Sequence, residues 1–235
     1  MRLAVVADGW QDVKIASDCV VLTCAIAGAG TDLVDRKQIG RESVKAFGGF
    51  EETSLTGQIL IAMPAMADPR FSQSVIFLCA HTPDGAMGIV LNQPLNKPRF
   101  AELLGQLGVE PVPPAREIRL TRGGPVEDNR GFVLHSADWM TEGSLEVDNA
   151  YVLTANMGIL EAIARGGGPK KGFLALGYAG WGPGQLDAEI LQNAWLNAPA
   201  DPQIVFDDAH RTKWQRALAK LGIDPAMLSG TAGRA

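Results

Sequence analysis

A short turn between two apolar runs limits the fold of this 235-residue chain more than any other feature. Residues 74–81 (SVIFLCAH) and 86–92 (AMGIVLN) are rich in the β-branched and apolar residues that favour strands. The residues between them, 82–85 (TPDG), combine proline, aspartate and glycine in the way that is typical of tight turns. The pattern therefore predicts a β-hairpin and, with it, a sheet that contains antiparallel strands.

Further strands and helices are predicted on both sides of this hairpin. Apolar runs bounded by glycine, proline or polar residues predict strands at residues 57–63, 118–135 (two strands around a glycine turn), 151–154 and 172–178. The sequence also predicts helices at residues 100–108, 156–165 and 211–222, and a helix or the start of one at residues 185–195. Early strands followed by interspersed helices indicate a mixed α+β domain over residues 55–235, with a mainly antiparallel or mixed sheet and helices packed on it.

Residues 1–54 differ from the rest of the chain, because no periodic strand or helix pattern emerges there. Residues 20–30 (VVLTCAIAGAG) have the length of a signal-peptide core. The segment before them carries three aspartates against one arginine and one lysine, whereas a secretory signal needs a positive leader. We therefore expect residues 1–54 to be a poorly structured extension, or the product of a start codon assigned too far upstream.

Composition limits the classes of partner. The formal net charge is −5, and a mildly acidic domain is a poor match for a phosphate backbone, so direct DNA binding is not expected. Three cysteines are too few for a disulfide framework, which indicates a reducing compartment, the cytoplasm. No apolar stretch approaches the roughly 18 residues that span a bilayer, so no membrane partner is expected. No Cys, His and Asp group has metal-ligand spacing and no cofactor motif is complete, so neither a metal nor a cofactor is predicted.

A glycine-rich corner, residues 176–190 (LGYAGWGPGQLDAEI), lies between a predicted strand and a predicted helix. A dinucleotide-binding loop needs the pattern G-x-G-x-x-G, but after Gly180 and Gly182 the third glycine position holds Gln185. We interpret the stretch as a strand-to-helix corner whose glycines supply unusual backbone angles. Trp181 in this corner either packs in the core or lines a binding site.

A second glycine corner, at Gly123 and Gly124, falls inside residues 121–135 (TRGGPVEDNRGFVLH). Backbone N–H groups displayed beside Arg122 could hold an anion, and the alternative is a hairpin loop whose charges face water. If the two corners meet, they would form a pocket for a small molecule or nucleotide. The residues predicted to line that pocket are Arg122, Gly123, Gly124, Tyr178, Gly180 and Trp181.

Cys79 is a candidate reactive thiol. His81 is two residues away on a predicted strand, which places both side chains on the same face, and a nearby histidine can promote the thiolate. Free cysteines are also among the most buried residues, so the alternative is a core cysteine. No complete catalytic set accompanies it, and the residues leave open whether the chain is an enzyme.

Residues 211–222 (RTKWQRALAKLG) predict an amphipathic helix with Lys213, Arg216 and Lys220 on its basic face. We interpret this face as the solvated side of the helix, and a nucleic-acid patch is the alternative.

Four separated blocks of the sequence closely resemble the YqgE/AlgH family of bacterial proteins. The blocks are residues 60–95, 123–135, 176–201 and 230–235, and the resemblance extends over about residues 56–235. It implies a compact α/β fold, a cytosolic location and, from the role proposed for one member, a part in transcriptional regulation. It implies no active-site residues. The first hypothesis is thus a cytosolic regulator that acts through protein or small-ligand contacts. The alternative is a small-molecule or nucleotide-binding enzyme with its pocket at the two glycine corners.

Overall fold

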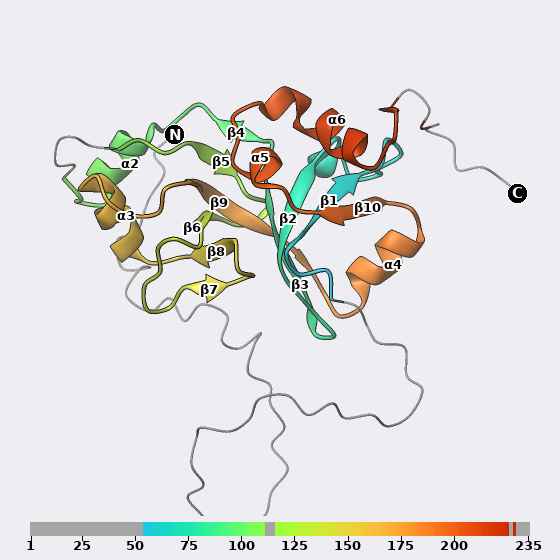
Figure 1. The fold of residues 1–235 in the computed structure, drawn as a ribbon, viewed down its shortest axis with the longest axis horizontal. Coiled ribbons are helices and arrows are strands. Elements are labelled where there is room, and N and C mark those ends of the chain that lie inside the picture. The colour runs from blue at the N-terminus through green and yellow to red at the C-terminus, as the bar shows by residue number, and fades with distance from the viewer. Residues whose placement is uncertain (1–53, 111–115, 226–227, 229–235) are drawn as a thin grey trace, which may run out of the picture.

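A curled sheet dominates the part of the chain that the structure, a computed structural model, describes, namely residues 54–110, 116–225 and 228 (Figure 1). These residues form ten strands and five α-helices, and one of the strand pairings is parallel while the others are antiparallel. The α+β class with a mixed, mainly antiparallel sheet is therefore confirmed. The predicted extension lies, except for its last residue, outside the described residues, so the boundary near residue 55 stays a prediction.

The elements carry the labels of Figure 1. The strands are β1 (Gln58–Ala62), β2 (Val75–Thr82), β3 (Gly85–Val90), β4 (Pro94–Leu95), β5 (Leu120–Arg122), β6 (Val126–Ser136), β7 (Leu145–Glu146), β8 (Tyr151–Thr154), β9 (Gly172–Trp181) and β10 (Trp195–Pro199). The helices are the 3-10 turn η2 (Pro69–Phe71), α2 (Phe100–Gln106), α3 (Met157–Ala164), α4 (Gln185–Leu191), α5 (Pro202–Val205) and α6 (His210–Lys220). None of these helices is long and apolar enough to cross a membrane.

Strand β9 organises the sheet because it pairs with three others. The main order is β10-β1-β2-β3-β9-β6-β8-β7, and the short β4–β5 pair joins β9 through the parallel contact of β5. The predicted hairpin is confirmed as β2 and β3, which close at Thr82 and Gly85. Helices α5 and α6 cover one side of the sheet over a core that includes Phe77 and Phe173. Helices α2 and α3 pack on a second core cluster, and α4 packs on a third (Figure 1).

The segment predicted as a helix over residues 185–195 is corrected by the structure. Helix α4 ends at Leu191, Asn193 adopts a left-handed φ of 57°, and Ala194 donates its N–H to the carbonyl of Glu189 at 2.9 Å. This geometry is a helix C-terminal stop that asparagine tolerates. Trp195 then begins β10, which pairs with β1 in antiparallel register. Pairing with β1 thus makes the residues from Trp195 onward a strand instead of a continuation of α4.

The predicted basic face of α6 is also corrected. Lys213 is fully buried and donates to the carbonyls of Ile204 and Asp207, and its ammonium lies 2.8 Å from the Asp207 carboxylate. Burying a lysine is tolerated only when its charge is compensated in this way. The two remaining members of that face, Arg216 and Lys220, pair with aspartates of the neighbouring α5 segment.

Candidate functional site

The two glycine corners meet, and they meet backbone to backbone. Gly123 donates its N–H to the carbonyl of Leu176 at 2.7 Å. A Cβ on Gly123 would lie 2.1 Å from the Gly177 carbonyl oxygen, and one on Gly124 would lie 2.0 Å from the carbonyl carbon of Tyr178. No side chain fits in such a gap, so these glycines allow two chain segments to touch. The contact shows that the two corners are neighbours and that Gly123 and Gly124 are needed for a close backbone approach.

Trp181 belongs to the core. Only 7% of its surface is exposed, and its ring lies edge-on to Trp195 at 6.0 Å. Both indole N–H groups donate to one carboxylate oxygen of Glu189, at 2.9 Å from Trp181 and 2.7 Å from Trp195. Gly184, with a left-handed φ of 65°, precedes α4 and turns the chain so that Glu189 reaches the pair.

The other predicted pocket residues are spread over a surface. Arg122 and Gly180 are exposed, and Tyr178 is half-buried with its ring edge-on to Phe132 at 5.7 Å. Two pockets in the described part of the chain are both lined by other residues. Ligand binding at the corners therefore stays a prediction, and the two pockets lie away from the corners.

Cys79 lies in the core with 2% of its surface exposed, and burial raises the pKa of its thiol far above the usual range. The prediction that Cys79 and His81 share a face is wrong. A β-bulge between Leu78 and Ala80 shifts the register of β2 and turns the following side chains over. His81 instead accepts the N–H of Leu55 through Nδ1 at 3.2 Å and faces Asp187 on the α4 side.

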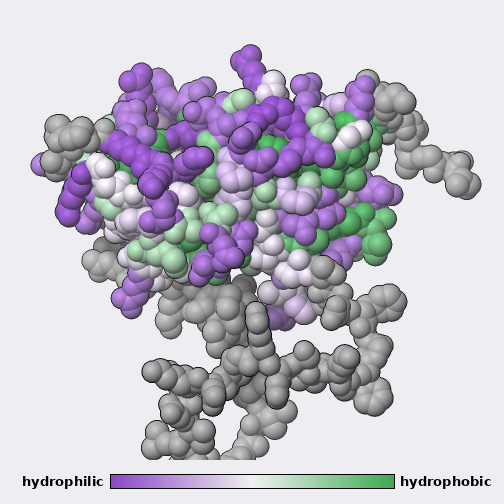
Figure 2. All heavy atoms as spheres, in the orientation of Figure 1, coloured by the Kyte–Doolittle hydropathy of each residue, from purple (hydrophilic) through white to green (hydrophobic). Residues whose placement is uncertain are grey.

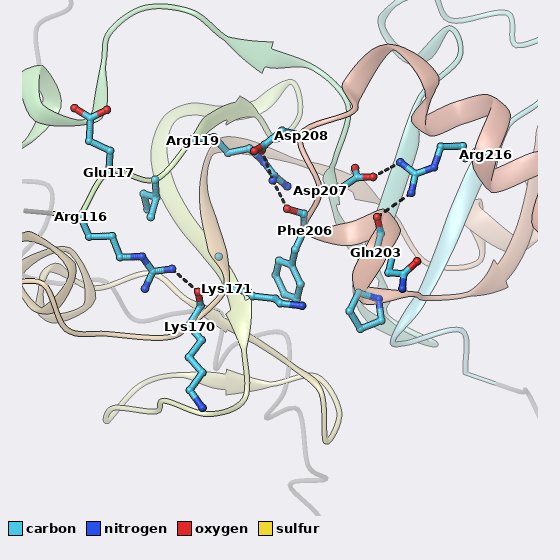
Figure 3. Close-up of a pocket in the computed structure, with 13 residues that line it drawn as sticks. Arg116, Glu117, Arg119, Lys170, Lys171, Gln203, Phe206, Asp207, Asp208 and Arg216 are labelled. Atoms are coloured by element: carbon cyan, nitrogen blue, oxygen red, sulfur yellow. Dashed lines mark hydrogen bonds and ion pairs between the residues drawn. The ribbon is translucent and has the colours of Figure 1, made fainter.

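A groove of about 590 Å³ lies where β5 and β9 begin, under the segment that joins α5 to α6 (Figure 3). We call it the Arg119 groove, after the arginine at its centre. Its walls come from four stretches of chain: residues 116–119, 170–172, 202–208 and Arg216. Hydrophilic residues dominate the surface over α5 and α6, as Figure 2 shows.

The parallel pairing of β5 with β9 builds the basic side of the groove. Leu120 lies opposite Leu174, so the residues that precede the two strands also run side by side. Arg116 accordingly donates to the carbonyls of Pro169 and Lys170, in the latter case at 2.6 Å. The pairing brings together basic residues that are more than fifty positions apart in sequence.

Arg119 ties the start of β5 to the α5–α6 segment. Its guanidinium donates to the carbonyls of Val205 (2.9 Å) and Phe206 (2.6 Å) and to Oδ1 of Asp208 (2.9 Å). It also lies 4.4 Å from the centre of the Phe173 ring, a cation–π geometry. Burial lowers the pKa of Arg119 and the contact with Asp208 opposes this shift. An arginine remains charged in such a site, so Arg119 holds a positive charge beneath the groove.

Asp207 is the carboxylate that anchors the far wall. It pairs with the buried ammonium of Lys213 and with the guanidinium of Arg216. Partial burial acts to raise its pKa, but hydrogen bonds from Lys213 and then Arg216 outweigh it and hold the pKa below the ordinary value. Asp207 is thus ionised and fully occupied by cations of α6.

The cations of the groove are not all neutralised. Five line it, namely Arg116, Arg119, Lys170, Lys171 and Arg216, against the three carboxylates Glu117, Asp207 and Asp208. Among the described residues, Arg116 contacts only neutral carbonyls, and no ion pair or hydrogen bond involves the Lys171 ammonium. In Figure 3, Lys171 extends toward Phe206, whereas Glu117 and Lys170 point away from the centre. Lys171 and Arg116 thus retain positive charge with which the groove could bind an anion.

Comparison with known proteins identifies the family. A family model described as AlgH-like matches residues 59–226. The chain belongs to the AlgH-like family. A UPF0301 protein of Rhodospirillum rubrum is 53% identical over 184 residues, which cover 78% of this chain and 96% of the relative. One from Afipia carboxidovorans is 54% identical over 191 residues, covering 78% of this chain and 91% of that protein.

Solved structures of two other bacterial proteins share the fold of this AlgH-like chain. The solution structure of AlgH from Pseudomonas aeruginosa matches with a TM-score of 0.64 and 43% identity, over 80% of this chain and 100% of that one. A crystal structure of a protein from Corynebacterium diphtheriae matches with a TM-score of 0.57 at 24% identity, over 70% and 85% of the two chains. The second likeness concerns the fold alone.

The basic residues of the groove did not emerge from the sequence. Arg116 and Arg119 flank the first residue of the strand segment predicted from residue 118, and Lys170 and Lys171 directly precede the strand predicted from residue 172. Basic pairs at the starts of two strands are the one local signal that could have indicated this site. The signal becomes meaningful only if the strands are parallel neighbours, which local patterns do not reveal.

Proposed function

We propose that this AlgH-like protein is a cytoplasmic regulator that binds a small anionic ligand in the Arg119 groove and acts on transcription indirectly. One observation carries the proposal: a groove of about 590 Å³ contains Lys171 and Arg116 without carboxylate partners. That volume falls in the range of small-molecule sites. Lys171 is exposed and Arg116 is half-buried, and cations of this kind form charge-assisted hydrogen bonds with carboxylate or phosphate groups. The net charge of −5 favours an indirect action over broad contact with DNA.

A ligand bound in the groove could change the exposed segment between α5 and α6. Arg119 holds the α5–α6 segment through two carbonyls and Asp208, whose side chain is 83% exposed. An anion in the groove would compete with Asp208 for this guanidinium. The segment after α5 would then change its position or mobility, and a partner protein could distinguish the two states.

Thermal unfolding with an anion panel tests the proposal. The full chain is heated at low salt with inorganic phosphate, dicarboxylates, phosphorylated sugars and nucleotides. At least one ligand should raise Tm, because binding to the folded state stabilises it. Lys171→Ala should abolish the rise, and Arg165→Ala, which removes the same charge from an exposed site just after α3, should not. If no anion in the panel raises Tm, the proposal fails.

DNA contact needs a separate measurement. Gel-shift experiments at low salt with the pure protein should show no sequence-specific complex. A sequence-specific complex would overturn the indirect mode of action while leaving the ligand site to be judged by the thermal data.

A second candidate function is a small-molecule or nucleotide-binding enzyme with its site at the two glycine corners. Its support is that the corners adjoin and that Arg122 is exposed beside them. The same panel separates the two sites. Stabilisation that Arg122→Ala removes and Lys171→Ala leaves intact would favour the corners over the groove.

A further inference from the structure

The Arg119 groove contains an aromatic ring as well as cations. Phe206 lines it and is half-buried. The ring packs against Tyr151 at 5.7 Å between centres, with an angle of 34° between the planes, which holds it in place. A ring held on one side and open to a groove on the other offers a surface on which a second planar ring can stack.

The cations of the groove suit a phosphate group. Arg116 uses two of the five N–H donors that a guanidinium carries, for the carbonyls of Pro169 and Lys170, so other donors remain. The carbonyls fix its position before any ligand arrives. Lys171 contributes an ammonium that extends toward Phe206 (Figure 3). Both a planar guanidinium and an ammonium are groups that commonly bind phosphate, and both line this groove.

The charge balance limits the size of the anionic group. Five cations face three carboxylates in the lining, and Asp207 is fully occupied by Lys213 and Arg216. The groove can thus neutralise about two negative charges. A phosphomonoester carries roughly −1.5 to −2 at neutral pH, and a triphosphate carries more than the groove can balance. The monophosphate is therefore the better match.

We propose that the Arg119 groove binds a nucleoside monophosphate, with the base against Phe206 and the phosphate at Lys171, in the groove that Arg116 also lines. This inference rests on the proposed function, because it names the ligand class of the same groove. The volume of about 590 Å³ accommodates a molecule of that size. The site lies apart from the two glycine corners.

Isothermal titration of the full chain at low salt tests the inference. The probes are the four common ribonucleoside monophosphates, ribose 5-phosphate, adenosine and ATP. At least one monophosphate should bind about tenfold or more tightly than ribose 5-phosphate, since stacking of a base on an aromatic ring contributes on that scale. Adenosine and ATP should both bind more weakly than the best monophosphate.

Variants assign the contributions of the ring and the charge. Phe206→Leu should weaken binding of the best monophosphate about tenfold and leave ribose 5-phosphate unchanged, while Phe206→Tyr keeps the ring and should bind normally. Lys171→Gln should weaken both ligands. Circular dichroism and Tm show whether each variant folds. If Phe206→Leu does not fold, Phe206→Tyr still tests whether an aromatic ring at this position supports binding.

The outcomes separate the two proposals. If ribose 5-phosphate binds as tightly as every monophosphate, or if Phe206→Leu binds the best monophosphate normally, the nucleotide inference is overturned and the anion site stands. If no probe and no other anion binds, both proposals fail. If binding survives Lys171→Gln but is lost in Arg122→Ala, the ligand occupies the glycine corners and the inference is wrong.

Discussion

Glu189 should contribute more to stability than its position on a seven-residue surface helix suggests. One of its carboxylate oxygens accepts the indole N–H groups of Trp181 and Trp195, and the other accepts from Gln185 at 2.8 Å. Both indoles are more than nine-tenths buried, so water cannot readily replace the carboxylate. Glu189→Ala therefore leaves two buried donors without an acceptor.

The expected cost follows from those two donors. A buried donor that loses its acceptor costs about 1–3 kcal/mol, so with two donors Glu189→Ala should lower the free energy of unfolding by about 2–6 kcal/mol. For a domain of this size that corresponds to a fall in Tm of roughly 4–24 °C. Glu189→Gln retains a carbonyl oxygen and should lose about half as much. Urea unfolding followed by circular dichroism at 222 nm gives both values.

Two comparisons decide whether the indoles are the cause. In a background of Trp181→Phe and Trp195→Phe, which keeps aromatic rings but removes both N–H groups, Glu189→Ala should cost less than about 1 kcal/mol. Glu161→Ala, at an exposed and loosely paired position on α3, should change stability by under about 0.5 kcal/mol. Equal losses from Glu189→Ala in the wild-type and doubly substituted backgrounds would show that the indole N–H groups are not the cause.

Three further predictions concern a glycine corner, the core thiol and a buried histidine. Gly124→Ala should lower the free energy of unfolding, measured with urea, by about 3 kcal/mol or more, because the added Cβ would collide with the backbone. Gly105→Ala is the control: its Cβ would have nothing within 4 Å, so it should be neutral or stabilising. Similar costs for both variants would contradict the close-contact explanation. Cys79 should react with a thiol reagent only after denaturation, because burial limits access and raises its pKa, and rapid labelling of the folded chain would support a reactive thiol. Burial lowers the pKa of His135 below 6.5, so the unfolded chain binds the proton first. The stability of the folded chain should therefore not be reduced by His135 above about pH 6.5 and should fall as the pH drops below that value. The fall should be less steep in His135→Asn. Identical urea midpoints for both proteins at each pH would show that His135 is not responsible.

Local patterns were sufficient for elements whose stabilising contacts lie nearby in sequence. The β2–β3 hairpin follows from a turn of four residues between two apolar runs. Helices α2 and α3 follow from apolar residues at helical spacing, because one face of each helix must be buried. Such signals do not depend on the rest of the chain.

Local patterns failed where a distant segment decided the outcome. Strand β10 exists because β1 offers its edge, and the only local signal was Asn193, a residue that tolerates the left-handed helix stop. Lys213 has the spacing of a surface residue, but carbonyls of α5 and the carboxylate of Asp207 allow it to be buried. The β-bulge before Ala80 turned His81 away from Cys79, and period-two reasoning assumes that no such bulge occurs.

Hydrophobic period and turn chemistry are short-range properties, so they were enough to predict the α+β class and the positions of most strands and helices, while the family followed from the resemblance of four sequence blocks. The sequence also placed the two glycine corners, although it could not show that Gly123 and Gly124 are needed for a backbone contact with β9. The burial of Trp181 in the core, and the groove that Arg116, Lys171 and Phe206 share, became visible in the folded chain. The physical reason is the parallel β5–β9 pairing and the packing of α5 over it, since both join segments that sequence spacing keeps far apart.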